Sequence, residues 1–408
     1  MDIAIVGAGL SGLAAGIELT NLGHTVEIYE SSDGIGGRVR TDAIDGKLLD
    51  RGFQILLTDY PEAKTLLDYD ALDLRTFEPG ALVRINDAFH RVGDPFRCSK
   101  DLVSTVRAPV GSLADKLRML RYRRQVLSGP VDSLWSAPES TTRERFSQLG
   151  FSQAMVDRFL GPLFAGTSLD PNLEGSSRST DFVFRMLSSG QAAVPARGMG
   201  QIPLQLAGQL PDGSVKINHQ VESVQENQLI VNGEKVSADA VVVATGVTDA
   251  SELCADFADQ PWKSVTSMWM ATETPPTLDP VLILNGGPAD PINTIAVMSR
   301  ISPYYGSGGK ATLVVSSPSV RPGIVDDMQE QLVNWYGKKS KLWDVLRVDQ
   351  IHHAQPHTVG NSRAGYTATP SGLWLCGDHQ LDSSINGALR SGRNVAAALH
   401  AQSEATSG

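Results

Sequence analysis

The amino-acid sequence predicts an α/β fold. The first 30 residues have the pattern strand, turn, helix and strand, which is the opening of a right-handed parallel βαβ unit. Strand patterns return over residues 214–247, and an apolar strand followed by a helix closes the chain. The 408 residues are enough for two or three structural units with a sizeable core.

The opening elements follow from hydrophobic periodicity. Residues 2–6 (DIAIV) form the apolar run of a short buried strand. Residues 11–22 repeat apolar side chains at helical spacing and stop before Gly23, a residue type that commonly follows a helix. Residues 25–30 (TVEIYE) alternate apolar and polar side chains, which predicts a second strand.

The rest of the chain contains further strands and helices. Residues 81–92 predict a hairpin with Asn86-Asp87 at its turn, and residues 99–195 are mainly helical in pattern. Further strands are expected within 214–247 and at 263–271, 281–284, 311–316 and 373–377, and further helices at 326–336 and 384–401. The small polar residues after His400 predict a frayed tail.

Composition and charge exclude several classes of protein. The chain is 41% hydrophobic and 20% charged, as in an ordinary globular protein. Its net charge of −10 argues against a nucleic-acid partner. Cys98, Cys254 and Cys376 form no disulfide or metal motif, so we expect a cytoplasmic protein without a metal site. No segment has the ~18 consecutive apolar residues of a membrane span.

A glycine-rich motif lies between the first strand and the first helix. It reads Gly7-Ala8-Gly9-Leu10-Ser11-Gly12 and fits GxGxxG. The first glycine permits a tight turn, Gly9 lets the backbone approach a pyrophosphate, and Gly12 lets helix and strand pack closely. Phosphates would bind the free N–H groups at the helix N-terminus. The opening unit is therefore predicted to be a Rossmann-type dinucleotide-binding domain.

An acidic residue stands where a dinucleotide site needs one. Glu30 ends the second strand, at the position whose carboxylate accepts hydrogen bonds from the adenosine ribose hydroxyls. The alternative is a strand-end carboxylate without a ligand. The complete unit favours a dinucleotide, and by itself it fits NAD or FAD.

The segment after Glu30 distinguishes the two cofactors. It leads into Gly36-Gly37-Arg38. In this the chain resembles the superfamily of FAD-dependent oxidoreductases that contains the flavin amine oxidases, protoporphyrinogen oxidases and carotenoid (phytoene) desaturases, whose second strand leads into a GGR loop. The resemblance implies FAD and places Gly36, Gly37 and Arg38 along its pyrophosphate and flavin. The alternative is that Gly-Gly-Arg forms a plain turn.

The far end of the chain shares this resemblance. Gly377-Asp378 follows a strand, and Ser384–Ala388 opens the last helix. The resemblance implies that Asp378 binds the ribityl or pyrophosphate part of FAD and that the Ile385 amide faces the flavin N1–C2=O edge. A helix N-terminus stabilises the negative charge that reduced flavin carries there. The backbone of Val221 would bracket the adenine.

The resemblance also implies a domain organisation. A discontinuous FAD-binding domain would combine residues 1–75, 195–255 and 350–408, and a substrate domain with a mixed sheet and helices would combine 76–194 and 256–349. No second GxGxxG follows a strand, so oxygen, a quinone or another acceptor is expected to reoxidise the flavin instead of NAD(P)H serving as reductant. No SGGCY-like motif precedes the last helix, which predicts non-covalent FAD.

We expect the enzyme to take a hydride from an organic, apolar substrate, as protoporphyrinogen oxidases and phytoene desaturases do. Ser267 aligns with the lysine of flavin amine oxidases, and residues 353–360 resemble protoporphyrinogen oxidases. Trp262, Met268, Trp269 and Met270 either form an apolar substrate wall or fill the core. The alternatives are a flavin amine oxidase, a non-redox FAD-dependent isomerase or cyclase of a polyene, and an FAD-stabilised binding protein.

The sequence shows no catalytic triad or carboxylate dyad. Gln54 is a candidate that either faces the substrate or caps a strand, and Tyr366 either forms an aromatic wall near the flavin or lies on the surface. The His352-His353 pair suggests no metal, because consecutive strand residues point to opposite faces. The basic stretch 116–124 is either a solvated helix face or a peripheral membrane contact.

Overall fold

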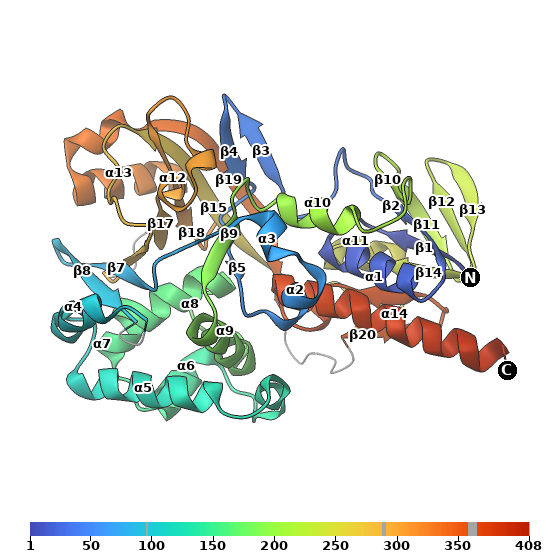
Figure 1. The fold of residues 1–408 in the computed structure, drawn as a ribbon, viewed down its shortest axis with the longest axis horizontal. Coiled ribbons are helices and arrows are strands. Elements are labelled where there is room, and N and C mark those ends of the chain that lie inside the picture. Colours follow the sequence, from blue (N-terminus) through green and yellow to red (C-terminus); the bar gives the residue numbers. More distant parts are fainter. Residues whose placement is uncertain (95–96, 288–290, 358–364, 408) are drawn as a thin grey trace.

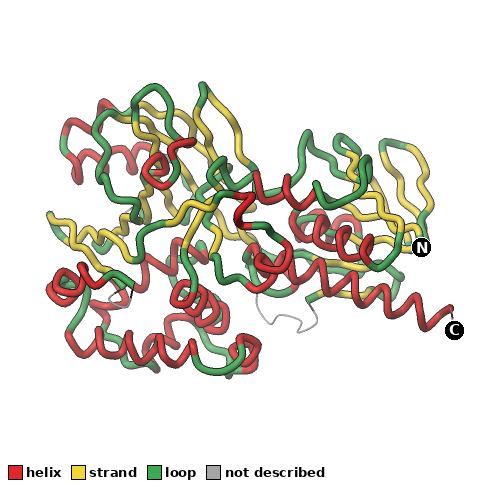
Figure 2. Tube along the Cα trace, in the orientation of Figure 1, coloured by secondary structure: helices red, strands yellow, loops and turns green. Residues whose placement is uncertain are grey.

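The computed structural model confirms an α/β fold, with one large sheet at each end of the molecule (Figure 1). The structure describes residues 1–94, 97–287, 291–357 and 365–407. Strands and helices are interspersed along most of the chain, and a layer of helices lies below the left half in Figure 2.

The sheet at the right of Figure 1 is parallel except for one edge strand. Its strand order is β10-β2-β1-β14-β21-β20, and β20 alone in this order pairs antiparallel. The strands are β1 (Asp2–Val6), β2 (Thr25–Tyr29), β10 (Val215–Lys216), β14 (Ala240–Val243), β20 (Tyr366–Ala368) and β21 (Trp374–Cys376). The carboxyl ends of the parallel strands meet at one edge, where ligands of open α/β sheets bind.

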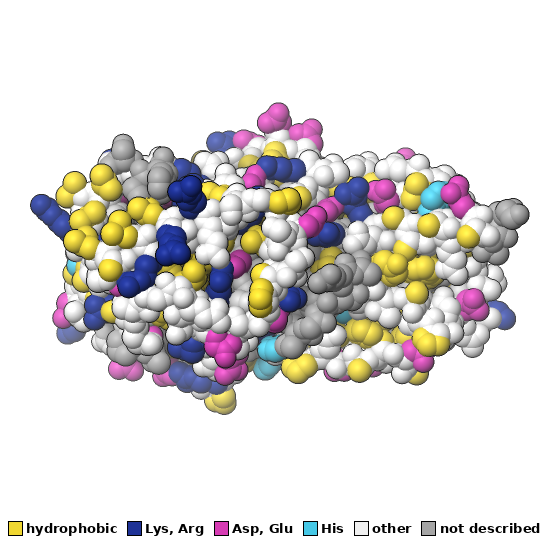
Figure 3. All heavy atoms as spheres, turned by 90° about the horizontal axis from the view of Figure 1, so that it is seen from below, with side chains coloured by type: hydrophobic (Ala, Val, Ile, Leu, Met, Phe, Trp, Pro, Cys, Tyr) yellow, Lys and Arg dark blue, Asp and Glu magenta, His cyan; other side chains and the backbone are white. Residues whose placement is uncertain are grey.

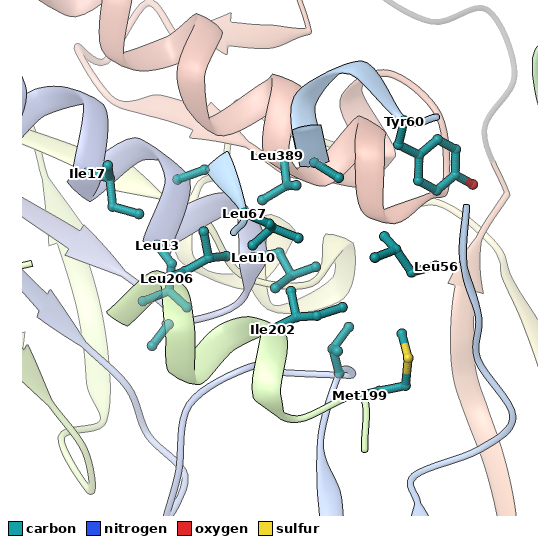
Figure 4. Close-up of a cluster of buried hydrophobic side chains, with 14 of the residues drawn as sticks. Leu10, Leu13, Ile17, Leu56, Tyr60, Leu67, Met199, Ile202, Leu206 and Leu389 are labelled. Atoms are coloured by element: carbon teal, nitrogen blue, oxygen red, sulfur yellow. The ribbon is translucent and has the colours of Figure 1, made fainter. Parts of the chain in front are cut away.

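Two helices pack together against this sheet. They are α1 (Leu10–Asn21), which follows β1, and α14 (Ile385–Ser407), which lies along α1 in Figure 1. A Cβ on Gly392 would lie 2.1 Å from the Ser11 carbonyl oxygen, so glycine is needed where the two helices touch. Figure 4 shows the core that α1 and α14 share with α10 (Gln201–Ala207), in which Leu13, Ile202 and Leu389 are fully buried. Each such side chain contributes roughly 1.5–3 kcal/mol to folding.

The sheet at the left is mixed. Its strand order is β19-β15-β18-β17-β16-β7-β8, in which β16 pairs with β7 in parallel and the other pairs are antiparallel. The strands are β7 (Gly80–Ile85), β8 (Ala88–Gly93), β15 (Trp262–Thr272), β16 (Leu282–Asn285), β17 (Thr294–Ala296), β18 (Ala311–Ser317) and β19 (Asp344–Pro356). One face packs on α13 (Ile324–Tyr336), through a core that includes Met268, Met270 and Met328.

A helical layer lies below the mixed sheet in Figure 1. Its helices are α4 (Leu102–Arg107), α5 (Leu113–Leu127), α6 (Thr142–Gln148), α7 (Gln153–Met155), α8 (Gly161–Ser168) and α9 (Ser177–Ser189), with a π-helical turn at Val156–Leu160. The other α-helices of the described residues are α2 (Pro61–Leu66), α3 (Tyr69–Leu72), α11 (Val247–Leu253) and α12 (Met298–Ile301). The small sheets comprise β3 (Thr41–Ile44) with β4 (Lys47–Asp50), β5 (Leu56–Leu57) and β6 (Leu74–Thr76) with β9 (Ala192–Pro195), and β11 (Val221–Gln225), β12 (Gln228–Val231) and β13 (Glu234–Ser237).

Most predicted elements are confirmed, and the differences have physical causes. The hairpin at 81–92 is present as β7 and β8, with Asn86 in the left-handed conformation at its turn. The prediction of a frayed tail after His400 is wrong, because α14 runs to Ser407 and Ser403 Oγ donates to the His400 carbonyl. The predicted domain boundary at residue 350 falls inside β19, which pairs with β15. No helix among the described residues is both long and apolar enough to span a bilayer.

Candidate active site

A cavity of about 1130 Å³ joins the two halves of the molecule, and we call it the central cavity. At one end it is lined by residues at the carboxyl ends of β1 and β2, among them Gly7 and Glu30. At the other end it reaches the mixed sheet at Val265, Leu282 and Ile351. Ordinary small-molecule sites occupy roughly 300–1,000 Å³, so the central cavity has room for a dinucleotide and a second molecule.

The glycines of the first loop play different parts. A Cβ on Gly12 would lie 2.0 Å from the Gly7 carbonyl oxygen, so this position must be glycine for the helix and the loop to pack. A Cβ on Gly9 would meet nothing within 4 Å, because Gly9 borders the central cavity. Gly9 is also the N-cap of α1, and because it has no side chain, no cap side chain accepts a hydrogen bond from the first N–H groups of the helix. An open space in front of a helix N-terminus fits a pyrophosphate.

The GGR loop faces the first loop across this space. The Gly36 N–H donates to the Ala8 carbonyl at 2.8 Å, which fixes one loop against the other. A Cβ on Gly37 would meet one neighbour within 4 Å, the Gly9 Cα at 3.5 Å. The two glycines therefore leave a cradle that side chains would fill.

Glu30 ties the first loop to the end of β2. Its side chain is buried, and its two oxygens accept hydrogen bonds from the Ala8 and Ser32 N–H groups, each at 2.9 Å. Each carboxylate oxygen retains accepting capacity toward the central cavity, which Glu30 lines. The remaining lone pairs of the Glu30 carboxylate could accept hydrogen bonds from ribose hydroxyls. Val221 and His219 line the same end of the central cavity.

Arg38 connects the two ends of the sequence. Its guanidinium donates to Asp378 Oδ1 at 2.6 Å and to the Ala354 carbonyl at 3.2 Å. It also lies 5.5 Å from the centroid of the Trp262 ring, a cation–π distance. The Asp378 side chain is 8% exposed, so the pair is largely shielded from solvent on the carboxylate side. The structure thus brings together two residues that the sequence singled out 340 positions apart.

The start of α14 lines the central cavity beside Arg38 and Asp378. Gly377, Ile385 and Ala388 line the central cavity at the N-terminus of the helix. Asp382 lies beside them, and burial raises the pKa of its carboxyl to about 6. The Ser384 hydroxyl donates to this carboxyl and opposes that rise.

Many apolar side chains line the far end of the central cavity, together with the polar Ser179, Thr180, Thr294 and Ser316. The apolar ones are Leu163 and Phe164 of α8, Val183 and Leu187 of α9, Leu282 and Leu284 of β16, and Phe53, Ile55, Val265 and Ile351. Of the two alternatives for Met268, Trp269 and Met270, the structure shows the core, because all three are buried in the hydrophobic clusters on either side of β15. Trp262 at the start of β15 does line the central cavity.

Lys263 is the lysine that β15 presents to the central cavity. Its Nζ donates to the Ser168 carbonyl at 2.9 Å. Burial lowers the pKa of the Lys263 ammonium, and the nearby Asp170 carboxylate partly offsets this. Ser267, which the sequence aligns with the amine-oxidase lysine, is buried farther along the strand. It is not among the residues that line the central cavity. Because Ser267 lies away from the central cavity, its presence in β15 does not count against an amine substrate.

The two candidate catalytic residues lie in different places. Gln54 lines the central cavity, and its Nε2 donates to the Arg38 carbonyl at 2.8 Å, so it also holds the GGR loop. Tyr366 lies in β20, with its ring 5.8 Å from that of Trp374, and is not among the residues that line the central cavity. The structure does not bring Tyr366 to the site.

Sequence reasoning missed an aromatic stack in the central cavity. The ring of His353 lies 5.0 Å from that of Trp262 with 19° between their planes, and both line the central cavity. Strand alternation could have suggested this, since His352 and His353 point to opposite faces of β19. Within the described ranges, His, Cys, Asp and Glu side chains form no group of three or more suited to a metal ion.

Comparisons with known proteins agree with this geometry. Residues 10–400 match the family described as flavin containing amine oxidoreductase. Protoporphyrinogen oxidase 2 of Arabidopsis thaliana is 31% identical over 173 residues, which are 42% of this chain and 33% of that protein. Hydroxysqualene dehydroxylase of Rhodopseudomonas palustris is 26% identical over 434 aligned residues, 97% of each chain. An oxidoreductase structure from Methanosarcina mazei superposes with a TM-score of 0.75 at 17% identity, covering 97% of this chain and 99% of that one.

Proposed function

The chain belongs to the family of flavin containing amine oxidoreductases, and on that premise we propose that it binds FAD non-covalently and oxidises a bulky, apolar organic substrate. It is a flavin-dependent oxidoreductase, and enzymes of this family act on a small molecule and pass electrons to an acceptor. The observation that carries the substrate proposal is the apolar far end of the central cavity, built from α8, α9 and β16.

The cofactor part of the proposal rests on the open cradle between the first loop and the GGR loop. Gly9 and Gly37 leave room for a pyrophosphate at the N-terminus of α1, and Glu30 presents carboxylate oxygens for a ribose. Arg38 and Asp378 would contact the middle of FAD, and the Ile385 amide would face its flavin. Bound FAD supplies the capacity to take two electrons from a substrate.

Non-covalent binding is supported by the position of the cysteines. Cys98, Cys254 and Cys376 are all described, and none of them lines the central cavity. Burial raises the pKa of the Cys376 thiol to about 12, which keeps it protonated and unreactive at neutral pH. Denaturation by acid or heat should release FAD into solution. Colourless protein that takes up no added FAD, or flavin that stays with the denatured chain, would contradict this part.

The substrate part rests on burial and charge. Leucine, phenylalanine and valine side chains on three elements favour an apolar molecule by about 25 cal/mol for each Å² removed from water. The Lys263 ammonium lines the same cavity, and it would repel a protonated amine. The relative matched over 97% of its length is named a hydroxysqualene dehydroxylase, and a second relative is named a protoporphyrinogen oxidase. Both names support a bulky apolar substrate.

An amine oxidase is the second candidate, and Lys263 favours it. Flavin amine oxidases commonly place a lysine on the corresponding strand, and β15 presents one to the central cavity. Assays with simple primary amines under air separate the two functions. We expect little hydrogen peroxide, whereas turnover with kcat/KM of ~10⁴ M⁻¹s⁻¹ or more, the lower range for normal enzymes, would establish the amine oxidase instead.

A further inference from the structure

The outer side of α4 and α5 exposes large apolar side chains that a water-facing helix ordinarily buries. We call residues 102–124 on this side the α4–α5 surface. Its exposed apolar side chains are Leu102, Val103, Val106, Leu113, Leu117 and Leu120. Leu113 is 64% and Leu117 67% exposed. A cluster of this kind on a folded protein marks an interaction surface, whereas scattered exposed leucines do not.

Helix α5 cannot turn these leucines inward. Its opposite side is fixed by Tyr122, which is fully buried and whose hydroxyl donates to Asp181 Oδ1 at 2.6 Å. The helix also begins with a capping box formed by Ser112 and Asp115. Leu113, Leu117 and Leu120 follow the spacing of one helix face, so they form a continuous outward stripe.

Helix α4 is attached beside α5. The Lys116 ammonium of α5 donates to the carbonyls of Val106, at 2.6 Å, and Ala108, at 2.9 Å. No residue of α4 is buried, and Leu102, Val103 and Val106 are exposed. Both helices therefore expose apolar side chains to solvent.

Basic side chains accompany the leucines. Residues 102–124 contain six Lys or Arg residues and one acidic residue, Asp115. The Asp115 carboxylate is fully buried and accepts hydrogen bonds from Ser112 and Ser152, whereas Arg107, Arg121 and Arg124 are exposed. The whole chain carries a net charge of −10, so this surface is a basic region on an acidic protein. In Figure 3 hydrophobic and basic side chains lie together at the left of the lower face, the end that α4 and α5 occupy in Figure 1.

We propose that the α4–α5 surface docks on an anionic lipid bilayer. Leucines on one helix face enter the boundary between headgroups and acyl chains, and the arginines bind acidic headgroups, which is how an interfacial helix binds. A second copy of this chain fits less well, because a symmetric dimer through this surface would set the same arginines against each other. The proposal does not depend on the identity of the substrate.

Vesicle co-sedimentation of the FAD-loaded protein tests the proposal. We expect binding to vesicles of phosphatidylcholine mixed with phosphatidylglycerol, little binding to pure phosphatidylcholine, and loss of binding as salt is raised. Leu117→Asp should weaken the partition by on the order of tenfold or more, since a buried leucine contributes about that factor. Arg121→Glu with Arg124→Glu should also weaken it by on the order of tenfold.

Leu204→Asp is the matched control, since Leu204 is an exposed leucine of α10, outside the α4–α5 surface. It should bind vesicles as the unchanged protein does, and all variants should keep their FAD and their thermal midpoint. Equal binding to neutral and anionic vesicles, or unchanged binding of both α4–α5 variants, would overturn the proposal. So would a dimer in sedimentation velocity that Leu117→Asp dissociates, without vesicle binding by the unchanged protein.

Discussion

At its nucleotide end the central cavity is bounded mainly by backbone, whereas at its far end it is bounded by side chains. Gly9 and Gly37 leave an open cradle in front of α1, and neighbouring loops are held by backbone hydrogen bonds such as Gly36 N–H to Ala8. The far walls come from leucines and a phenylalanine on α8, α9 and β16. A backbone cradle accepts one kind of group, a phosphate, while side-chain walls can change with the substrate.

The largest effect should come from filling the cradle. Gly9→Val should abolish FAD binding, because its side chain would stand in the space that we assign to the pyrophosphate. Gly9 has an ordinary φ of −72°, so the backbone tolerates valine. The flavin content of the purified variant measures the outcome. Gly208→Val on the exposed end of α10 is the control and should remain yellow; a folded Gly9→Val protein with full flavin content would show that the phosphates lie elsewhere.

A smaller loss should follow from removing the carboxylate that pairs with Arg38. Asp378→Ala leaves the guanidinium without its 2.6 Å partner at the middle of the cofactor site. Such a loss costs about 1–3 kcal/mol, which corresponds to a roughly 5- to 150-fold rise in the Kd for FAD. Fluorescence titration of the apoprotein would measure it. Asp33→Ala removes the partner of Arg40 on the surface instead, and equal losses in the two variants would contradict a specific role for Asp378.

A substitution at the far end of the central cavity should affect substrate turnover without affecting FAD binding. Leu163→Ser makes the apolar wall more polar without touching the cradle. We expect kcat/KM for an apolar substrate to fall by about tenfold, with the Kd for FAD unchanged. Leu278→Ser, at a leucine that is 69% exposed, is the control. Parallel losses of FAD and activity in Leu163→Ser would mean that the two ends are not independent.

The smallest expected effect is on stability, and it appears as pH dependence. Burial raises the pKa of Asp382 from 3.8 to about 6, so the folded state binds more protons than the unfolded state between these values. The stability that the protonated carboxyl contributes is present below pH 4 and is lost as pH rises through about 6. The free energy of unfolding should fall over this window in the unchanged protein and in Asp212→Asn, an exposed control. Asp382→Asn should not show this fall, and a parallel pH profile would contradict the assignment.

The contrast between the nucleotide end and the far end of the central cavity also explains which parts of the site can be predicted from the sequence. The GxGxxG motif, Glu30 and the first three elements lie within one short stretch, where spacing fixes the geometry. The far end depends on contacts between distant segments. Trp262, Lys263 and Val265 reach the central cavity whereas Ser267 does not, because pairing of β15 with β18 and β19, including an irregularity after Lys263, decides where the strand leaves it.

Tyr366 and β19 show the same limit. Tyr366 looks free to form a wall near the flavin until its strand is paired with β21, which turns it toward Trp374. The 13 residues of β19 alternate weakly in hydrophobicity, since much of the strand is exposed at the edge of the mixed sheet. Neither fact follows from local sequence.

Anaerobic reduction of the bound flavin tests the central claim most directly, that one cavity holds FAD at its backbone end and an apolar substrate at its side-chain end. The purified yellow protein is mixed in turn with a porphyrinogen, a polyene, a small primary amine and NADPH, and the flavin absorbance is followed. We predict that a porphyrinogen or polyene bleaches the flavin and that air or a quinone restores it, while the amine and NADPH leave it oxidised. Rapid stoichiometric bleaching by the amine or by NADPH, with none by the apolar compounds, would contradict the account.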